Sequence, residues 1–226
     1  MVEICLVIHR RHYRMPELMK QLKEQTYQDF RVNIWNNTPS KNVDVRNLSS
    51  SRVKIINSET GNIGSCARFK LAKETKGDLI IFIDDDLILD KDFIEYHVNM
   101  YKKYGAKCIL GWWSKIYKEE NYHKAMVWLK EGVEVDYIGT GGMIISRKVI
   151  DEFIELQDMP EEYRKVEDLY LSFLAQKYKY KLIAIDRRCN IYSDGYDQYH
   201  KLAEYKQKAF LKLRKEGWKL LKDKSI

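Results

Sequence analysis

Residues 79–86 read Leu-Ile-Ile-Phe-Ile-Asp-Asp-Asp, so a run of five apolar residues ends abruptly in three consecutive aspartates. Because both faces of such a run are apolar, it predicts a buried strand of a parallel sheet. Three adjacent carboxylates repel one another and add nothing to the stability of a fold. Their place at the carboxyl end of the strand, where open α/β sheets bind ligands, indicates a hard divalent cation held by oxygen atoms. The alternative for an isolated Asp-x-Asp is a solvated acidic turn.

The rest of the chain alternates between strand-like and helical segments, as is typical of a mostly parallel sheet flanked by helices. Its 226 residues suit one α/β domain with a substantial core, and no repeat or linker interrupts them. Residues 112–137 fit neither pattern clearly. We expect strands at 2–8, 30–35, 53–57, 79–83, 107–110, 143–145 and 181–185, and helices at 16–24, 63–73, 91–104, 148–156 and 167–177.

The net charge of +7 is concentrated near the C-terminus, where residues 201–224 contain nine basic and three acidic residues. The first 200 residues carry no basic stripe, which argues against a nucleic acid as partner. We expect an amphipathic terminal helix. Its lysine face is either solvated, with the helix packed on the domain, or in contact with an anionic membrane or a partner. Its expected apolar residues are Leu202, Tyr205, Phe210 and Leu213.

The four cysteines are far apart, lie mostly in apolar segments and have no metal-ligand spacing. We therefore expect Cys5, Cys66, Cys108 and Cys189 to be reduced, buried thiols of a protein in the cytoplasm. The N-terminus begins directly with a strand, and no apolar run approaches the ~20 residues that a membrane span needs. The sequence thus predicts a soluble or peripherally membrane-associated protein.

Further short motifs follow the ends of the predicted strands. His-Arg-Arg follows the first strand at 9–11, and Asn-Asn-Thr ends the second at 36–38. A turn at 61–68 reads Gly-Asn-Ile-Gly-Ser-Cys-Ala-Arg, Gly-Thr-Gly-Gly-Met occupies 139–143, and Glu-Asp occupies 167–168. In order and spacing, these motifs together with Asp84-Asp85-Asp86 resemble the family 2 glycosyltransferases of the GT-A fold. The resemblance covers about residues 2–195.

The resemblance implies a single catalytic domain with a nucleotide-sugar site at the carboxyl edge of the first four strands. About 1–105 would form the nucleotide-binding half, about 106–198 the acceptor-binding half, and 199–226 the basic helix. Asp84 and Asp86 match the family's Asp-x-Asp motif, which contacts the ribose and binds a metal that bridges the diphosphate. Mn²⁺ or Mg²⁺ suits such oxygen ligands, whereas zinc would favour His and Cys, which do not cluster here. The donor-binding residues implied are His9, Arg11, Asn36, Asn62, Gly64, Arg68, Asp84, Asp85, Gly141 and Gly142.

Two of these positions have alternatives of their own. A helix beginning near Ile63 would point free amides and its positive dipole end at a phosphate, with Gly64 permitting close approach. Arg68 matches the family's arginine near the base and the diphosphate, or else is an exposed arginine on an amphipathic helix. Asn36 stands where the family usually has an aspartate that accepts the uracil imide hydrogen. Its amide can serve uracil or, flipped, another base, or Asn36 is an ordinary turn residue.

On the acceptor side, Glu167-Asp168 resembles the family's Glu-Asp pair, in which the aspartate is the catalytic base. Such a base must reach the acceptor hydroxyl, whereas a purely structural pair would complement the helix dipole. With Glu167, the aromatic residues Trp112 and Trp113 are the expected acceptor contacts, although core packing also explains at least one of them. Thr140 with Gly141 and Gly142 would form the floor beneath the donor sugar. Asp194 is a candidate third metal ligand, and His200 is a weaker one that a solvated loop explains as well.

The sequence therefore predicts metal-dependent transfer of a sugar from a nucleotide donor, with UDP preferred, to a hydroxyl of a glycan, glycolipid or glycoprotein. By resemblance, the mechanism is inverting, with retention of configuration, which some GT-A enzymes achieve without such a base, as the alternative. Two other classes stay open. A haloacid-dehalogenase-like phosphatase also places Asp-x-Asp after an apolar strand, but usually has Thr or Val where this chain has Ile88. A non-catalytic nucleotide- or carbohydrate-binding module would bind the same ligands without turnover.

Overall fold

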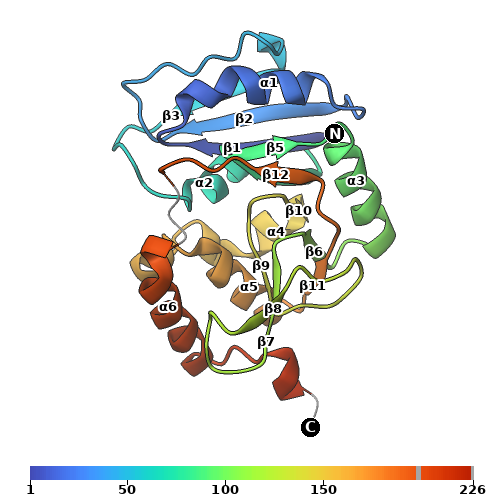
Figure 1. Ribbon diagram of the computed structural model, residues 1–226, viewed down its shortest axis with the longest axis vertical. Coiled ribbons are helices and arrows are strands. Elements are labelled where there is room, and N and C mark those ends of the chain that lie inside the picture. The colour runs from blue at the N-terminus through green and yellow to red at the C-terminus, as the bar shows by residue number, and fades with distance from the viewer. Residues whose placement is uncertain (197–199, 225–226) are drawn as a thin grey trace.

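Residues 79–84 form β4 (Leu79–Asp84) in the middle of a seven-stranded sheet. Figure 1 shows the computed structural model, with the neighbouring strands β1 and β10 labelled. The structure describes residues 1–196 and 200–224. The strand order is β11-β6-β10-β4-β1-β2-β3, and only β10 runs antiparallel to its neighbours. The predicted mostly parallel α/β sheet is confirmed. The other strands of this sheet are β1 (Val2–Ile8), β2 (Phe30–Asn36), β3 (Val53–Asn57), β6 (Cys108–Gly111), β10 (Met143–Ser146) and β11 (Lys181–Ala184).

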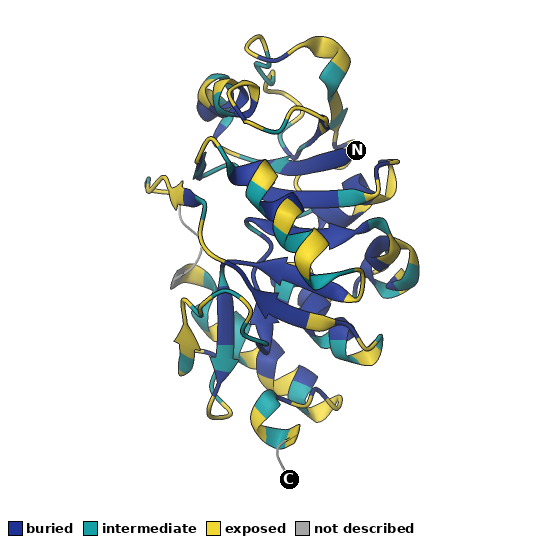
Figure 2. Ribbon diagram, turned by 90° about the vertical axis from the view of Figure 1, so that its right-hand side faces the viewer, coloured by how far each residue is buried: buried dark blue, intermediate teal, exposed yellow. Residues whose placement is uncertain are grey.

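Helices cover both faces of the sheet, so the core is divided into two layers (Figure 2). Alternate residues of β4 serve the two layers. Ile81 and Ile83 pack with α1 (Met15–Lys23) and α3 (Phe93–Tyr104), whereas Ile80 and Phe82 pack on the opposite face. This double burial is why the strand has no polar face. The helices of the second layer are α2 (Ala67–Lys73), α4 (Arg147–Glu152), α5 (Glu167–Lys177) and α6 (Ala203–Lys215).

Two small antiparallel sheets complete the fold and explain the segment that the sequence left unassigned. Residues 112–138 contain β7 (Ser114–Tyr117), β8 (Ala125–Val127) and β9 (Tyr137–Ile138), in the order β8-β7-β9. The other sheet pairs β5 (Leu87–Leu89) with β12 (Cys189–Ile191). These strands of two to four residues are too short to show an alternating pattern. Short 3₁₀ turns lie at His12–Arg14, Ser50–Arg52, Ile154–Leu156, Glu161–Tyr163, His200–Leu202 and Leu221–Lys224.

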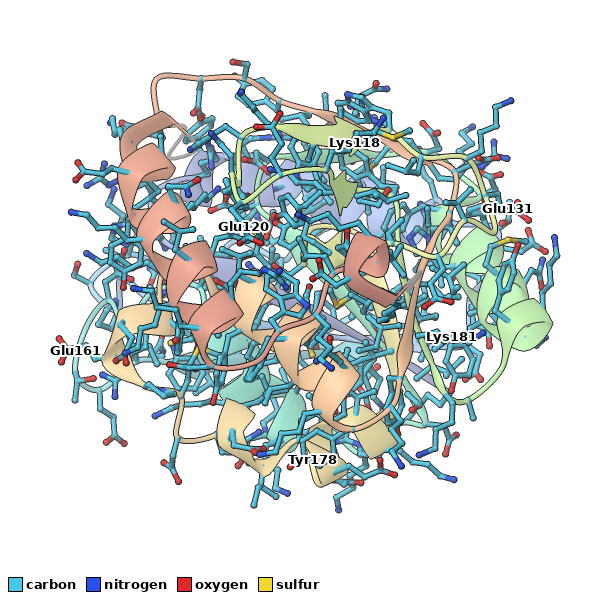
Figure 3. All side chains as sticks on the ribbon, turned by 90° about the horizontal axis from the view of Figure 1, so that it is seen from below. Lys118, Glu120, Glu131, Glu161, Tyr178 and Lys181 are labelled. Carbon is cyan, nitrogen blue, oxygen red and sulfur yellow. The ribbon has the colours of Figure 1, made fainter. Side chains whose placement is uncertain are left out.

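The C-terminal helix α6 packs on the domain through the apolar face predicted from the sequence. Phe210 and Leu213 are fully buried, and Leu202 and Tyr205 are partly buried. Glu161 and Lys181, both labelled in Figure 3, are among the charged residues that are exposed on the surface. The four cysteines are buried free thiols, as predicted. Within the described residues, no helix combines the length and the apolar composition needed to cross a bilayer.

Candidate active site

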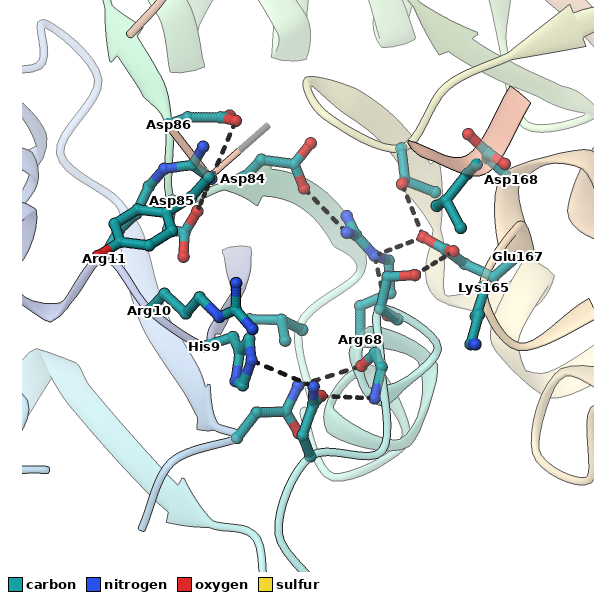
Figure 4. A pocket seen from close by; sticks show the side chains of 18 of the residues that line it. His9, Arg10, Arg11, Arg68, Asp84, Asp85, Asp86, Lys165, Glu167 and Asp168 are labelled. Atoms are coloured by element: carbon teal, nitrogen blue, oxygen red, sulfur yellow. Dashed lines mark hydrogen bonds and ion pairs between the residues drawn. The ribbon is translucent and has the colours of Figure 1, made fainter. Parts of the chain in front are cut away.

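A cavity of about 520 Å³ opens at the carboxyl edge of β1, β2 and β4 (Figure 4). Its walls come from segments far apart in the sequence: the loop after β1, the turn before α2, the end of β4 and the start of α5. This edge is where α/β sheets bind ligands. The predicted site residues that line the cavity are His9, Arg11, Asn62, Gly64, Arg68, Asp84, Asp85, Asp86, Thr140, Glu167 and Asp168.

A second cavity, of about 250 Å³, adjoins the first. The residues that line only this cavity carry no charge and include the aromatic Trp112, Trp113 and Tyr137. A space that binds two substrates for one reaction needs such a common boundary, where the reacting groups can meet. The residues that line both cavities are Asp84, Asp86, Thr140, Asp168 and Lys206.

Two arginines compensate the three aspartates at the end of β4. Arg68 Nη2 donates to Asp84 Oδ1 at 2.8 Å, and Arg11 Nη1 lies 3.0 Å from Asp85 Oδ1 and 3.3 Å from Asp86 Oδ2. Burial raises the pKa of Asp85, and the charge of Arg11 acts in the opposite direction. The side chains of Asp84 and Asp86 stay 38% and 22% exposed, compared with 12% for Asp85. The two outer aspartates are therefore the ones that a ligand can reach.

Asp194, predicted to be a metal ligand, binds Arg11 instead, and this corrects the prediction. Arg11 Nε and Nη2 donate to its two oxygens at 2.9 and 2.8 Å, and the Tyr13 hydroxyl donates at 2.6 Å. These bonds, those of Arg11 first, hold the pKa of Asp194 well below its usual range. Across residues 1–196 and 200–224, no group of three His, Cys, Asp or Glu side chains is arranged to bind a metal. The side chain of His200 lies outside the described residues.

Asp84 and Asp86 nevertheless fit an oxygen-ligated cation better than any other pair predicted from the sequence. Both line the two cavities, and Asp84 uses only Oδ1 in its hydrogen bond with Arg68. Two carboxylates leave most of the coordination sphere of Mn²⁺ or Mg²⁺ to phosphate oxygens and water, which is common for Mg²⁺. Binding of a metal by these two residues stays a prediction.

Asparagine side chains hold the turn before α2, and the helix begins four residues later than predicted, at Ala67. Gly64 N donates to Asn62 Oδ1 at 2.9 Å, and Ile63 N donates to Asn37 Oδ1 at 3.2 Å. These acceptors compete with helical hydrogen bonds. Gly64 has a φ of 85°, which glycine adopts without strain. The predicted helix start near Ile63 is therefore wrong, whereas contact of this turn with a phosphate stays a prediction.

Arg68 and Glu167 form the buried centre of the site. Arg68 is 5% and Glu167 is 4% exposed, and Arg68 Nε lies 3.1 Å from Glu167 Oε1. Glu167 also accepts hydrogen bonds from the Ser65 hydroxyl and, at 3.1 Å, from the Thr140 hydroxyl. Burial raises the pKa of Glu167, and the charge of Arg68 opposes this. Glu167 lines the first cavity and not the second, so the predicted acceptor contact is corrected: Glu167 fixes Arg68.

Asn36 lies behind the first cavity and does not line it. Its Nδ2 donates to Lys41 O and to Asn57 Oδ1, both at 2.9 Å, and its Oδ1 accepts from Thr38 N at 3.0 Å. Because the side chain is fully buried and its amide is used within the protein, the predicted contact of Asn36 with a base is corrected. The neighbouring Asn37 lines the cavity instead.

Gly141 and Gly142 have different roles. A Cβ on Gly141 would lie 2.3 Å from Asp84 Oδ2, and one on Gly142 would lie 2.4 Å from Trp112 Nε1. Gly141 lines the second cavity, but Gly142 is buried beneath Trp112, so the predicted ligand contact of Gly142 is corrected. Trp112 and Trp113 both line the second cavity, and their stacking on an acceptor stays a prediction.

Among the residues that line the cavities, Tyr137 and Lys206 belong to none of the motifs noted in the sequence, and Asn37 lies in the Asn-Asn-Thr motif but was not predicted to contact a ligand. The Tyr137 hydroxyl donates to Asp168 Oδ2, Lys206 of α6 lines both cavities, and Asn37 lines the first. The sequence signal for Asn37 is its place beside Asn36 at the end of a strand. Tyr137 and Lys206 belong to segments whose patterns indicate no ligand, and only tertiary contacts place them beside Asp168.

The family of the chain follows from its sequence. Residues 3–154 match the profile of Glycosyl transferase family 2, which is more than half of the chain. The chain therefore belongs to glycosyl transferase family 2, and the resemblance noted in its motifs is confirmed. The match contains β1 to β4, the acidic edge and Gly141, and it ends before Asp168.

Individual relatives agree with this family. An uncharacterized glycosyltransferase of Haemophilus influenzae (strain ATCC 51907 / DSM 11121 / KW20 / Rd) is 31% identical over 86 residues, which are 38% of this chain and 29% of the relative. The structure of S. aureus TarS 1-349 in complex with UDP is similar with a TM-score of 0.58 and 15% identity, over 85% of this chain and 60% of that 1-349 chain. Its complex with UDP-GlcNAc is similar with a TM-score of 0.59 and 15% identity, over 87% of this chain and 59% of that chain. This likeness supports the GT-A fold. The chain spans less than two thirds of each of these proteins.

Proposed function

We propose that the protein is a metal-dependent glycosyltransferase that moves a sugar from a UDP-sugar to a hydroxyl of a glycan, glycolipid or glycoprotein, with inversion at the anomeric carbon. The observation that carries this proposal is the pair of cavities that meet at Asp84, Asp86 and Asp168. One space has a charged wall suited to a nucleoside diphosphate. The other has an aromatic wall suited to a sugar ring. The shared residues supply acidic groups at the junction.

The first cavity suits the donor because of Arg68. Its Nη1 is buried and has no hydrogen-bond partner among the described residues, while its other nitrogens bind Asp84, Glu167 and Ser65 O. A fixed guanidinium with one donor unused matches a phosphate oxygen. Asp84 and Asp86 would hold the Mn²⁺ or Mg²⁺, which would neutralise the charge that develops on the departing diphosphate. The UDP and UDP-GlcNAc complexes of TarS favour uridine as the base.

The junction of the cavities suits a general base. Asp168 would take the proton of the acceptor hydroxyl as that oxygen bonds to the anomeric carbon, while the bond between this carbon and the diphosphate oxygen breaks and its electrons leave with the diphosphate. Attack from the second cavity and departure into the first place the two oxygens on opposite sides of the sugar, so the configuration inverts. Trp112 and Trp113 would orient the acceptor.

The test replaces Asp168 with Asn, which keeps the shape of the side chain but cannot accept the proton. We expect UDP affinity, measured by calorimetry with Mn²⁺, to persist, and sugar transfer to fall by ~10²–10⁴-fold. Asp151→Asn, an exposed aspartate of α4 that lines neither cavity, is the matched control and should retain full transfer.

Near-normal transfer by Asp168→Asn would exclude Asp168 as the base and with it this inverting mechanism. Binding of UDP-sugars by the parent protein without transfer to any hydroxyl acceptor would instead identify a binding module. The phosphatase alternative is excluded by the family to which the chain belongs.

A further inference from the structure

Behind Asp168, strands β7 and β9 place a lysine and a tyrosine side by side in the interior. Lys115 of β7 is the register partner of Tyr137 of β9, and such partners project to the same face of a sheet. Both side chains are buried, with 2% and 1% of their surface exposed. An interior lysine is rare unless a nearby group compensates its charge.

Tyr137 connects this pair to the candidate base. Its hydroxyl donates to Asp168 Oδ2, and Leu169 N donates to Asp168 Oδ1 at 2.8 Å. Both oxygens of the carboxylate are thus held by donors. Tyr137 also lines the second cavity, beside Asp168 and Trp113, so its phenol contacts the base at the place where an acceptor would enter.

Lys115 lies against the other side of Tyr137, within a box of aromatic rings. Its Nζ is 3.6 Å from the centroid of the Tyr122 ring and 5.6 Å from that of Tyr137, and it donates to Tyr122 O at 3.4 Å. Two charged groups face it from the packed helices, Asp168 of α5 and Lys206 of α6. Burial, and then the charge of Lys206, lower the pKa of Lys115 to about 8, while Asp168 acts in the opposite direction. Asp168 therefore offsets only part of the cost of burying the ammonium.

We propose that Tyr137, backed by Lys115, is a positioning residue that fixes the orientation of the Asp168 carboxylate for the acceptor hydroxyl. The proposal rests on the proposed function, because it assigns Asp168 as the base. An aspartate with a free χ1 spends part of its time pointing away from its substrate. The hydrogen bond from the Tyr137 hydroxyl restricts this rotation, and Lys115 packs against the Tyr137 ring from the other side. The device needs no contact between either residue and the substrate.

The first test is Tyr137→Phe, which removes only the hydroxyl. We expect kcat to fall about tenfold, the effect of one lost interaction of ordinary strength in the transition state, while the Kd for UDP stays within twofold. The matched control is Tyr163→Phe. Tyr163 is equally buried and donates to Glu216 at 2.9 Å, but lines neither cavity, so its loss should leave kcat in place.

Two variants of Lys115 test the positioning role if Tyr137→Phe does not fold. Lys115→Met removes the ammonium but keeps the phenol, and should lower kcat while the Kd for UDP is kept. Lys115→Arg keeps the charge beside the Tyr137 ring and should restore kcat toward the value of the parent protein. A kcat that stays at the value of the parent protein in every folded variant of Tyr137 and Lys115 overturns the proposal.

Failure of the proposed function can be distinguished from failure of the positioning role. A parent protein without any transfer activity would contradict the function but not the contact between Tyr137 and Asp168. The buried phenolic proton of Tyr137 should then still give a slowly exchanging NMR resonance that is absent in Tyr137→Phe and shifted in Asp168→Asn. Absence of this resonance in the parent protein would overturn the positioning role, whether or not the protein transfers sugar.

Discussion

The buried ammonium of Lys115 predicts a substitution that stabilises the protein. Its pKa is lowered from 10.5 to about 8, because burial disfavours the charged form and Lys206 repels it. At 1.36 kcal/mol per pKa unit, this difference corresponds to a cost of about 3 kcal/mol at pH 7. Replacing buried charges with apolar residues of similar size is often neutral or stabilising. We therefore expect Lys115→Met to raise the free energy of unfolding at pH 7 by up to about 3 kcal/mol.

The sign of the pH dependence follows from the direction of the shift. Below pH 8 both the folded and the unfolded states carry the ammonium, so the full cost of burying it is present. Between pH 8 and 10.5 the unfolded state binds more protons at this site than the folded state, so the cost falls as the pH rises. At pH 9.5 the advantage of Lys115→Met should be reduced to about 1 kcal/mol. The difference between parent and variant isolates this site from other groups that titrate in the same range.

Urea unfolding at pH 7 and at pH 9.5 measures both values. Lys118→Met is the control. Lys118 is exposed and follows the same strand, so its replacement should change the free energy by less than about 0.5 kcal/mol at either pH. A Lys115→Met protein that is less stable than the parent at pH 7, or whose advantage does not change with pH, would refute the reasoning. In that case the contacts of the ammonium with the rings of Tyr122 and Tyr137 outweigh its desolvation.

Three further predictions concern the acidic edge and the C-terminal helix. Asp86→Ala should weaken UDP binding in Mn²⁺ by about tenfold or more without affecting the fold, and EDTA should weaken UDP binding by the parent protein. Calorimetry that shows unchanged UDP affinity in both experiments would contradict the metal site. Gly141→Ala should weaken UDP binding, because the new Cβ would lie 2.3 Å from Asp84 Oδ2. Gly195→Ala should not, because no atom of the described residues lies within 4 Å of that Cβ. Lys208 and Lys212 pair with Glu204 and Glu162, so we expect no co-sedimentation with anionic vesicles at physiological salt. The contrary result would be salt-sensitive co-sedimentation that is lost when Lys208, Lys212, Lys215 and Lys219 are replaced with Gln. That result would establish a membrane contact, with about 1 kcal/mol of binding free energy per lysine.

Elements of the fold that depend on local residue patterns can be predicted from the sequence alone. β4 is recognisable because five consecutive apolar residues must be buried on both faces, and the acids after it are confined to the sheet edge. The face of α6 follows from helical periodicity, and Phe210 and Leu213 are buried as expected. The resemblance also selected most of the residues that line the first cavity. A motif needs only the correct residue types at the correct spacing.

Contacts between segments far apart in the sequence determine the partners of the polar residues. Arg11 binds Asp194, 183 residues away, so an aspartate expected to bind a metal neutralises an arginine instead. Asn37 and not Asn36 reaches the cavity, because contacts from Lys41 and Asn57 hold Asn36 behind it. Such choices depend on geometry and desolvation between distant segments, for which the sequence has no local pattern.

The same reason applies to the base and its support. Asp168 is recognisable from the Glu-Asp pair, but Tyr137 and Lys115 lie on strands of two and four residues, too short for a period of two to be read. Their pairing is fixed only when β9 adds to β7 and α5 packs against β9. Burial then gives the lysine its lowered pKa and the tyrosine its contact with Asp168. The sequence contains these residues, but their relation to the base exists only in the folded chain.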